Sequence, residues 1–321
     1  MITMRRMRAL AIGLVAVGVA ALIAAVVVGE SSGGERIEVG TRPQPPVPDE
    51  PPCPGGRPPR PRVDRVDEDR AFSLLRQQVE LGPRPAGSAT SRRLGERLRR
   101  LLPNGRFEPV PARTGAERPL RNIVGAVRGR DPERLVVVGA HYDTKDLPGF
   151  VGANDGAGGT AAVVEIARSI RPRELGLSVV FILFDGEESP RGTSDAVFER
   201  AGLRGSRAAA RRYPGGAAMV LLDLVADRRL SIPREANSTP ALWESLRAAA
   251  ARAGVGCAFP ARSRDAVSDD HKPFLEAGVP AIDLIDFEFG CWHKRCDDMS
   301  AVSERSLDAS AEAVRELLAR L

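Results

Sequence analysis

The sequence is poor in lysine, and nearly all of its basic residues are arginines. Lys145, Lys272 and Lys294 are the exceptions in a chain with a net charge of +5. The arginines are interspersed with acidic residues, and no basic stripe with interleaved aromatic residues occurs along the sequence. We therefore interpret the positive charge as a property of the solvated surface and expect no nucleic-acid partner.

Cysteine is also scarce, and the 4 cysteines form no Cys-x-x-Cys motif. A zinc site built from cysteines is therefore disfavoured. Cys53, Cys257, Cys291 and Cys296 permit three disulfide pairings and fit an oxidising compartment. Cys291 and Cys296 flank His293 closely enough that a disulfide between them would close one short loop.

The one long apolar run of the sequence lies at the N-terminus. Residues 1–8 form a basic tail, and residues 9–29 are apolar or glycine over about the twenty residues that a helix needs to cross a bilayer. We predict an uncleaved membrane anchor, with the tail in the cytoplasm and the remainder exported. A cleaved signal peptide is the alternative, and the protein would then be secreted. Both interpretations place the rest of the chain outside the cytoplasm.

The remaining chain divides into a linker and one large domain. Residues 30–64 are rich in proline and glycine and predict a semi-stiff spacer. Residues 65–321 alternate strands with helices, which is typical of an α/β domain whose mainly parallel sheet is covered by helices on both faces. We expect strands near residues 107–110, 122–127, 135–138, 177–184, 218–225 and 279–285, and helices near residues 67–81, 94–101, 157–169, 206–212, 239–253 and 303–318.

The strand expected at residues 177–184 is followed closely by two adjacent acids, Glu187 and Glu188. Consecutive apolar residues from Val179 to Phe184 indicate a strand buried on both faces. Because open α/β sheets place ligands and catalytic groups beyond the carboxyl ends of their strands, this position favours a chemical role for the two glutamates. Taken alone, however, such a pair more often begins a solvated helix after a turn.

Further potential metal ligands follow other predicted strands. His141, Asp223 and His293 each lie at or after a strand end, and a glycine-rich loop lets Asp155 point into the same crevice. The chain has only 3 histidines, and the third is His271. Imidazole and carboxylate ligands in one mixed cluster suit Zn²⁺ with an open position for catalysis. The sequence therefore predicts a zinc site at one edge of the sheet.

Five motifs follow one another along the chain: His141-Tyr142-Asp143, Gly152-Ala153-Asn154-Asp155, Asp185-Gly186-Glu187-Glu188, Asp223 and Trp292-His293. In this order they resemble the zinc aminopeptidase and glutaminyl-peptide cyclotransferase superfamily. The resemblance covers roughly residues 65–321 and includes the segment 82–88. It implies a three-layer α/β fold, with a central mostly parallel but mixed sheet flanked by helices, and an enzyme that acts on the N-termini of peptides or proteins.

The resemblance implies two alternative metal arrangements. In the cyclotransferases a single zinc ion is held by residues that correspond to Asp155, Glu188 and His293. In the aminopeptidases two zinc ions share the carboxylate of Asp155, and His141 and Asp223 complete the second site. Glu187 is implied as the acid/base in both branches, because one glutamate binds the metal while its neighbour stays free to move a proton.

The cyclotransferase branch is the closer match, because the segment 269–275 and a tryptophan before the last histidine are similar to it. This branch converts N-terminal glutamine to pyroglutamate and releases ammonia. The resemblance then implies Asp269 and Asp223 as members of a proton network with Glu187, Trp292 as a wall of the substrate pocket, and Asp143 and His271 behind the metal ligands.

Two other interpretations stay open. Segment 189–193 lacks the aromatic residue that cyclotransferases usually carry shortly after the glutamate pair, so a zinc aminopeptidase that releases N-terminal amino acids is the alternative. A non-catalytic, membrane-tethered binding module is the third interpretation. It is disfavoured because every ligand position and the proposed acid/base are filled.

Overall fold

The computed structural model describes residues 53–112 and 118–321. The basic tail, the apolar segment 9–29 and the linker up to residue 52 lie outside the described residues. Among the helices that the structure describes, none combines the length and the apolar character that a membrane crossing requires. The N-terminal anchor therefore stays a prediction.

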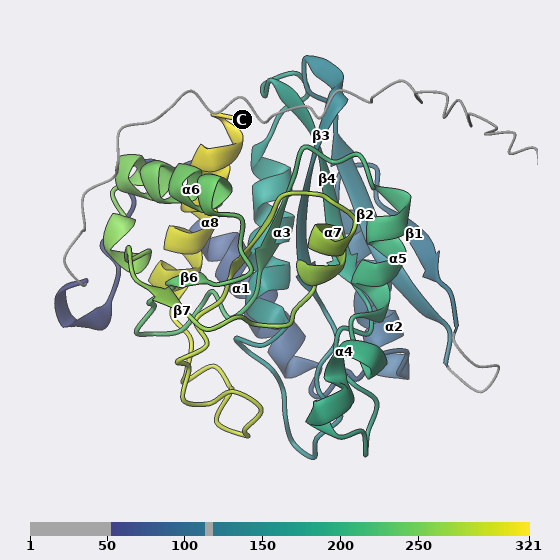
Figure 1. Ribbon diagram of the computed structural model, residues 1–321. Coiled ribbons are helices and arrows are strands. Elements are labelled where there is room, and N and C mark those ends of the chain that lie inside the picture. Colours follow the sequence, from purple (N-terminus) through teal and green to yellow (C-terminus); the bar gives the residue numbers. More distant parts are fainter. Residues whose placement is uncertain (1–52, 113–117) are drawn as a thin grey trace, which may run out of the picture. The chain divides into compact units, whose positions relative to one another are not determined.

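A six-stranded mixed sheet forms the centre of the described domain (Figure 1). Its strands are β1 (Arg106–Val110), β2 (Leu120–Val127), β3 (Asp131–His141), β4 (Leu177–Phe184), β5 (Ala218–Leu222) and β8 (Ala281–Leu284). Their order across the sheet is β1-β2-β4-β3-β5-β8. Strands β4, β3, β5 and β8 run parallel, whereas β2 runs antiparallel to both β1 and β4. The predicted mostly parallel, mixed sheet is confirmed.

Helices cover both faces of the sheet and complete the three layers. One face carries α1 (Glu68–Glu80), α2 (Ala89–Leu101), α3 (Ala157–Ser169), α6 (Pro240–Ala253) and α8 (Glu304–Leu318). Figure 1 shows α3, α6 and α8 together on the left of the sheet. The other face carries α5 (Arg204–Arg212) and α7 (Lys272–Glu276).

The alternation of side chains along each strand divides the core in two. In β3, Val136 and Val138 pack with the helices of the first face, whereas Val137 packs with α5 and α7 on the second. Successive side chains of a strand point to opposite faces of the sheet, so a strand that is covered on both sides is apolar throughout. This explains the continuous apolar runs of the sequence.

The strand predicted at 177–184 and the helix predicted at 157–169 have the observed bounds of β4 and α3. β3 begins earlier than the predicted strand at 135–138. The prediction missed its first residues because they are exposed and carry no apolar signal. The sequence missed α4 (Phe198–Ala201), α7 and a separate two-stranded sheet of β6 (Arg234–Glu235) and β7 (Ser263–Arg264). These elements are too short for hydrophobic periodicity to detect.

Two disulfides select one of the three pairings that the sequence left open. Cys291 is bonded to Cys296, and Cys53 is bonded to Cys257. The Cys53 bond, together with a hydrogen bond from the Arg62 backbone N–H to the Ala253 carbonyl, attaches residues before position 65 to the region around the end of α6. The boundary between linker and domain at residue 64 stays a prediction.

Candidate metal centre

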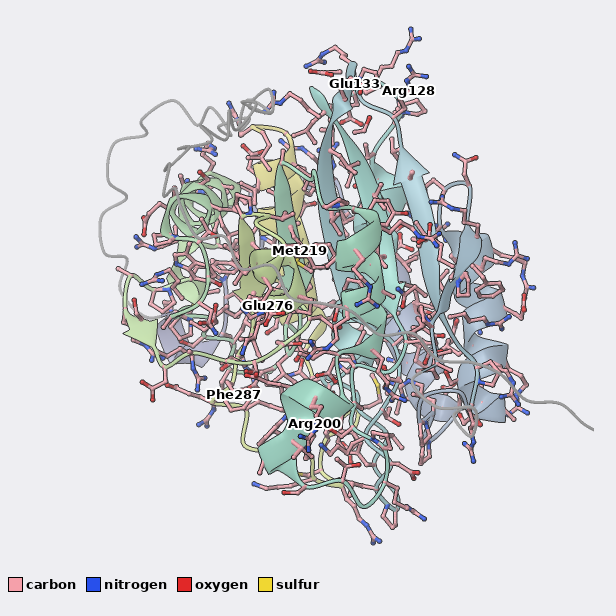
Figure 2. The ribbon with its side chains drawn as sticks, turned by 45° about the vertical axis from the view of Figure 1, so that its right-hand side comes forward. Arg128, Glu133, Arg200, Met219, Glu276 and Phe287 are labelled. Atoms are coloured by element: carbon pink, nitrogen blue, oxygen red, sulfur yellow. A yellow bond between two sulfur atoms is a disulfide. The ribbon has the colours of Figure 1, made fainter. Side chains whose placement is uncertain are left out.

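The carboxyl ends of the parallel strands lie at one edge of the sheet. Figure 2 shows Glu133, near the start of β3, at the opposite end of the sheet from Phe287, which follows β8. The predicted ligands belong to this second end: His141 is the last residue of β3, Glu188 follows β4, Asp223 follows β5, and His293 lies in the loop after β8.

The structure brings Asp155, Glu188 and His293 together into one cluster. The Nε2 atom of His293 lies 3.2 Å from Glu188 Oε1 and 3.5 Å from Asp155 Oδ2. Candidate ligand atoms of the three residues all lie within 4.8 Å of one another. The spacing allows one cation to contact all three side chains.

A second cluster shares the Asp155 carboxylate. The Nε2 atom of His141 lies 3.3 Å from Asp155 Oδ1 and 3.4 Å from Asp223 Oδ1. The two oxygens of Asp155 thus face different histidines, which is the arrangement of a bridging carboxylate. Both of the ligand sets that the sequence analysis considered are therefore assembled.

The donor set fits zinc. Asp155 Oδ2 is buried and accepts no hydrogen bond from any residue that the structure describes. Buried carboxylates that face one another cost free energy unless a cation or a proton neutralises them. Two imidazoles and three carboxylates offer the nitrogen and oxygen ligands that Zn²⁺ prefers. An ion in this place would satisfy the unpaired oxygen.

Two residues that the sequence analysis did not identify position Asp155. The carboxylate of Asp297 accepts hydrogen bonds from the backbone N–H groups of Asn154 (2.7 Å) and Asp155 (3.1 Å). The buried guanidinium of Arg84 donates to the carbonyls of Val151 and Gly152. Arg84 lies in the segment 82–88 that the resemblance includes, whereas no local pattern distinguishes Asp297 from the other acids near it.

Asp143 positions the backbone of the glutamate pair. Its carboxylate accepts hydrogen bonds from the backbone N–H groups of Gly186 (3.1 Å), Glu187 (3.3 Å) and Glu188 (3.3 Å). Gly186 has a φ of 77°, which favours glycine and turns the chain sharply after β4. After this turn the Glu188 side chain belongs to a candidate ligand cluster, whereas that of Glu187 does not.

His293 is held by its loop. Its φ of 53° lies in the left-handed region, which is uncommon for a residue with a side chain. The loop is closed by the Cys291–Cys296 disulfide, and Phe150 packs edge-on against the imidazole with ring centroids 6.0 Å apart. The disulfide thus restricts the backbone of His293, and the contact with Phe150 restricts its imidazole ring.

Glu187 is a buried carboxyl group next to the ligand Glu188 in sequence. Burial and the negative charge of Glu188 raise its pKa well above the ordinary value. A raised pKa makes a carboxylate a stronger base toward the protons of a bound molecule. Its side chain also lines the pocket described below, so a bound molecule can reach it.

A group of buried acids extends from the pocket into the domain. Burial and the charges of Asp283 and Asp223 raise the pKa of Asp269 well above its ordinary value. Behind Asp269, the Nε2 atom of His271 lies 3.3 Å from Glu235 Oε1, and its Nδ1 atom lies 3.7 Å from Asp283 Oδ2. His271 thus belongs to neither ligand cluster.

A pocket of about 260 Å³ opens beside the two clusters. Trp292 lines it, is 38% exposed and stacks on His293 with ring centroids 4.1 Å apart, which argues against a role in ordinary core packing. Phe287 and Phe198 add further aromatic surface. Phe198 belongs to α4, so an aromatic residue that follows segment 189–193 in the chain lines the pocket. The sequence analysis did not identify Phe198, because α4 itself was missed.

Comparison with known proteins identifies relatives of both branches. A glutaminyl-peptide cyclotransferase of Drosophila melanogaster is 27% identical over 60% of this chain and 63% of its own length. A probable zinc metalloprotease of Leptosphaeria maculans is 32% identical over 54% of this chain and 48% of its own length. The chain therefore spans about half to two thirds of the length of these curated relatives.

Solved structures give the same result at higher coverage. A glutaminyl cyclase of Porphyromonas gingivalis has a TM-score of 0.71 and 28% identity, covering 79% of this chain and 99% of that chain. A leucine aminopeptidase precursor of Bacteroides thetaiotaomicron has a TM-score of 0.71 and 26% identity, covering 80% and 98%. These similarities confirm the α/β fold class. Residues 122–318 match peptidase family M28, so the chain belongs to this family and is an enzyme of the superfamily of zinc peptidases and glutaminyl cyclases.

Proposed function

We propose that the protein is a zinc-dependent glutaminyl-peptide cyclotransferase, which converts an N-terminal glutamine to pyroglutamate and releases ammonia. The observation that carries the proposal is the buried carboxyl group of Asp269, which lines the pocket together with Asp223 and Glu187. Burial beside other acids raises the pKa of Asp269, so this carboxyl group takes up a proton more readily than an exposed one. A reaction that expels ammonia requires a proton at the leaving nitrogen, and such a network supports its delivery.

Asp155, Glu188 and His293 are the residues that would hold the zinc ion. When bound, the ion supplies a Lewis acid that polarises the side-chain carbonyl of the glutamine. Trp292 and Phe287 wall the pocket, exclude water and hold the side chain folded toward the α-amine. Because amine and amide belong to the same residue, this confinement makes ring closure an oriented intramolecular step.

Glu187 moves the proton in this scheme. The α-amine attacks the side-chain amide carbon, and Glu187 accepts a proton from the amine as the new carbon–nitrogen bond forms. Glu187 then returns that proton to the amide nitrogen as the original carbon–nitrogen bond breaks, and ammonia leaves. The raised pKa of Glu187, caused by burial and by the charge of Glu188, suits both halves of the transfer.

The products of two peptide series test the proposal. The protein is incubated with zinc and with matched peptides that begin with glutamine or with leucine. Ammonia and a blocked N-terminus from the glutamine series would support the cyclotransferase, whereas release of a free amino acid would support the peptidase. If neither product forms with zinc supplied, both the cyclotransferase and the aminopeptidase are contradicted for these peptides.

A zinc aminopeptidase is the second candidate, and the intact cluster of His141, Asp155 and Asp223 favours it. This cluster offers ligands for a second ion that the cyclotransferase scheme does not need. Metal analysis of the folded protein separates the two candidates, since one zinc ion per chain favours cyclisation and two favour hydrolysis.

We also infer that the domain lies outside the cytoplasm. Its two disulfides, Cys53–Cys257 and Cys291–Cys296, support this placement because disulfides persist in oxidising compartments. Labelling intact cells with a reagent that does not cross the membrane tests the inference, and protection of the domain from that reagent would contradict it.

A further inference from the structure

The pocket contains a guanidinium group for which the proposed reaction has no use. Arg264, the last residue of β7, lines the pocket together with residues of both ligand clusters. Its Nε and Nη1 atoms are buried and find no hydrogen-bond acceptor in the described part of the chain. Buried N–H donors are almost always paired, so unpaired donors in the wall of a substrate pocket point to an acceptor that the ligand brings.

Arg264 ends a stack of rings that begins at a proposed zinc ligand. The ring centroids of His293 and Trp292 lie 4.1 Å apart, and those of Trp292 and Phe287 lie 4.7 Å apart. The Cζ atom of Arg264 lies 4.7 Å from the centroid of Phe287. Stacking on an aromatic face restricts the guanidinium plane, and the pairing of β7 with β6 at Glu235 fixes the Arg264 backbone. The charge is therefore held at a defined place in the pocket wall.

The stack sets the position of this charge along a bound peptide. An extended chain advances by about 3.3 Å per residue. Along the stack Arg264 lies at most about 14 Å from His293. In a peptide whose first residue faces His293, an acidic side chain on the second or third residue can therefore extend toward Arg264. The other cation lining the pocket, Lys145, lies 3.3 Å from Glu188 Oε2 and so belongs to the metal end.

We propose that Arg264 selects peptides that carry a carboxylate shortly after the first residue. The guanidinium would bind that carboxylate through charge-assisted hydrogen bonds. The assignment rests on the proposed function, which places the N-terminal residue beside Asp155, Glu188 and His293. The carboxylate has two sources: an acidic side chain at position two or three, or the C-terminal carboxylate of a dipeptide or tripeptide.

Peptide affinity tests the assignment without turnover. Calorimetry with zinc-supplied Glu187→Gln protein compares Gln-Glu-Ala-amide, Gln-Ala-Glu-amide and Gln-Ala-Ala-amide, together with Gln-Ala-Ala as the free acid. We expect at least one carboxylate peptide to bind about tenfold more tightly than the neutral amide, as for one charge-assisted contact. Preference for the first two peptides identifies an acidic side chain as the source, and preference for the free acid identifies the C-terminus.

Variants of Arg264 in the same background locate the preference. Arg264→Gln should abolish it, Arg264→Lys should retain part of it, and Arg264→Glu should transfer it to Gln-Lys-Ala-amide. Arg262→Gln is the matched control, because Arg262 is exposed, pairs with Glu288 and does not line the pocket. The control should keep the full preference.

The assignment and the proposed function fail separately. Survival of the preference in Arg264→Gln, equal binding of all peptides, or no measurable binding would overturn the assignment. Ammonia release from Gln-Ala-Ala-amide by the unmodified enzyme tests the proposed function alone. If no ammonia forms while Arg264→Gln still abolishes the preference, the cyclotransferase falls and the carboxylate site of Arg264 stands.

Discussion

The two ligand clusters share Asp155 but are built in different ways. His141 ends β3 and Asp223 follows β5, so the register of the sheet positions them. Glu188 and His293 come from loops, and the His293 side chain is 20% exposed where that of His141 is 2% exposed. A ligand at a strand end is positioned by the packing of the sheet in the core, whereas a ligand on a loop is positioned by hydrogen bonds and crosslinks of the loop itself. The loop-built cluster should therefore be the more sensitive to distant substitutions.

The largest effect should come from Glu187, which belongs to neither cluster. Glu187→Gln should keep zinc bound and lower turnover by about 10²–10⁴-fold, because a positioned proton carrier is lost. Steady-state kinetics and metal analysis on the same sample check this. Glu188→Gln is the control and should lose zinc as well as activity. Near-normal turnover of Glu187→Gln would show that another group moves the proton.

Removing the anchors of the ligands should have the next largest effect. Asp143→Ala deletes the acceptor of three backbone hydrogen bonds at the glutamate pair, and zinc affinity should fall about 10–100-fold. Asp297→Ala acts on the Asp155 loop and should weaken both clusters. Competition with a chelator measures both affinities. An unchanged affinity in Asp143→Ala would mean that the loop-built cluster needs no such anchor.

Removing each of the two disulfides should have a different effect: one removal should weaken zinc binding, and the other should lower the stability of the fold. Replacing Cys291 and Cys296 by serine frees the His293 loop and should lower zinc affinity about tenfold, the lower end of the range for residues that support a ligand. Replacing Cys53 and Cys257 should instead lower the free energy of unfolding by about 2–5 kcal/mol and leave zinc affinity unchanged. Denaturant unfolding and chelator competition are measured on both variants. Equal changes in zinc affinity and in the free energy of unfolding for the two double variants would contradict this prediction.

The smallest effect concerns an acid that lies outside both clusters. Burial and the charges of Glu68, Glu312 and Asp64 raise the pKa of Asp308 from 3.8 to about 8, against the opposing charge of Arg60. Because the folded pKa lies above the unfolded one, the folded state binds the proton more tightly, and stability falls as the pH rises between these two values. Asp308→Asn should therefore raise the melting temperature by about 2–4 °C at pH 8, the shift that one kcal/mol produces.

The same variant should melt with the wild type near pH 3, where Asp308 is protonated in both states. Thermal unfolding at the two pH values checks the prediction. A stabilisation that is equal at both values would assign the effect to packing and not to charge. Asp308 thus serves as a reference for a buried acid that has no cation site, in contrast to Asp155.

The sequence predicted the candidate residues at strand ends because a strong local signal precedes each of them. Glu187 and Glu188 follow a continuous apolar strand, and His141 ends another. Asp297 and Arg84 were missed because they act through backbone groups that are distant in sequence. Phe198 and Arg264 were missed for a related reason: they belong to elements that are too short for periodicity to detect.

The sequence alone determined the succession of strands and helices along the chain and the side chains that could bind a metal. The apolar runs and their spacing predicted alternating strands and helices, and the motifs identified the side chains capable of binding a metal. Only the tertiary structure decided that Asp155 faces two histidines, that Cys53 pairs with Cys257, and that Arg264 ends an aromatic stack. The physical reason is that periodicity records which face of one element is buried, whereas these contacts depend on how separate elements meet.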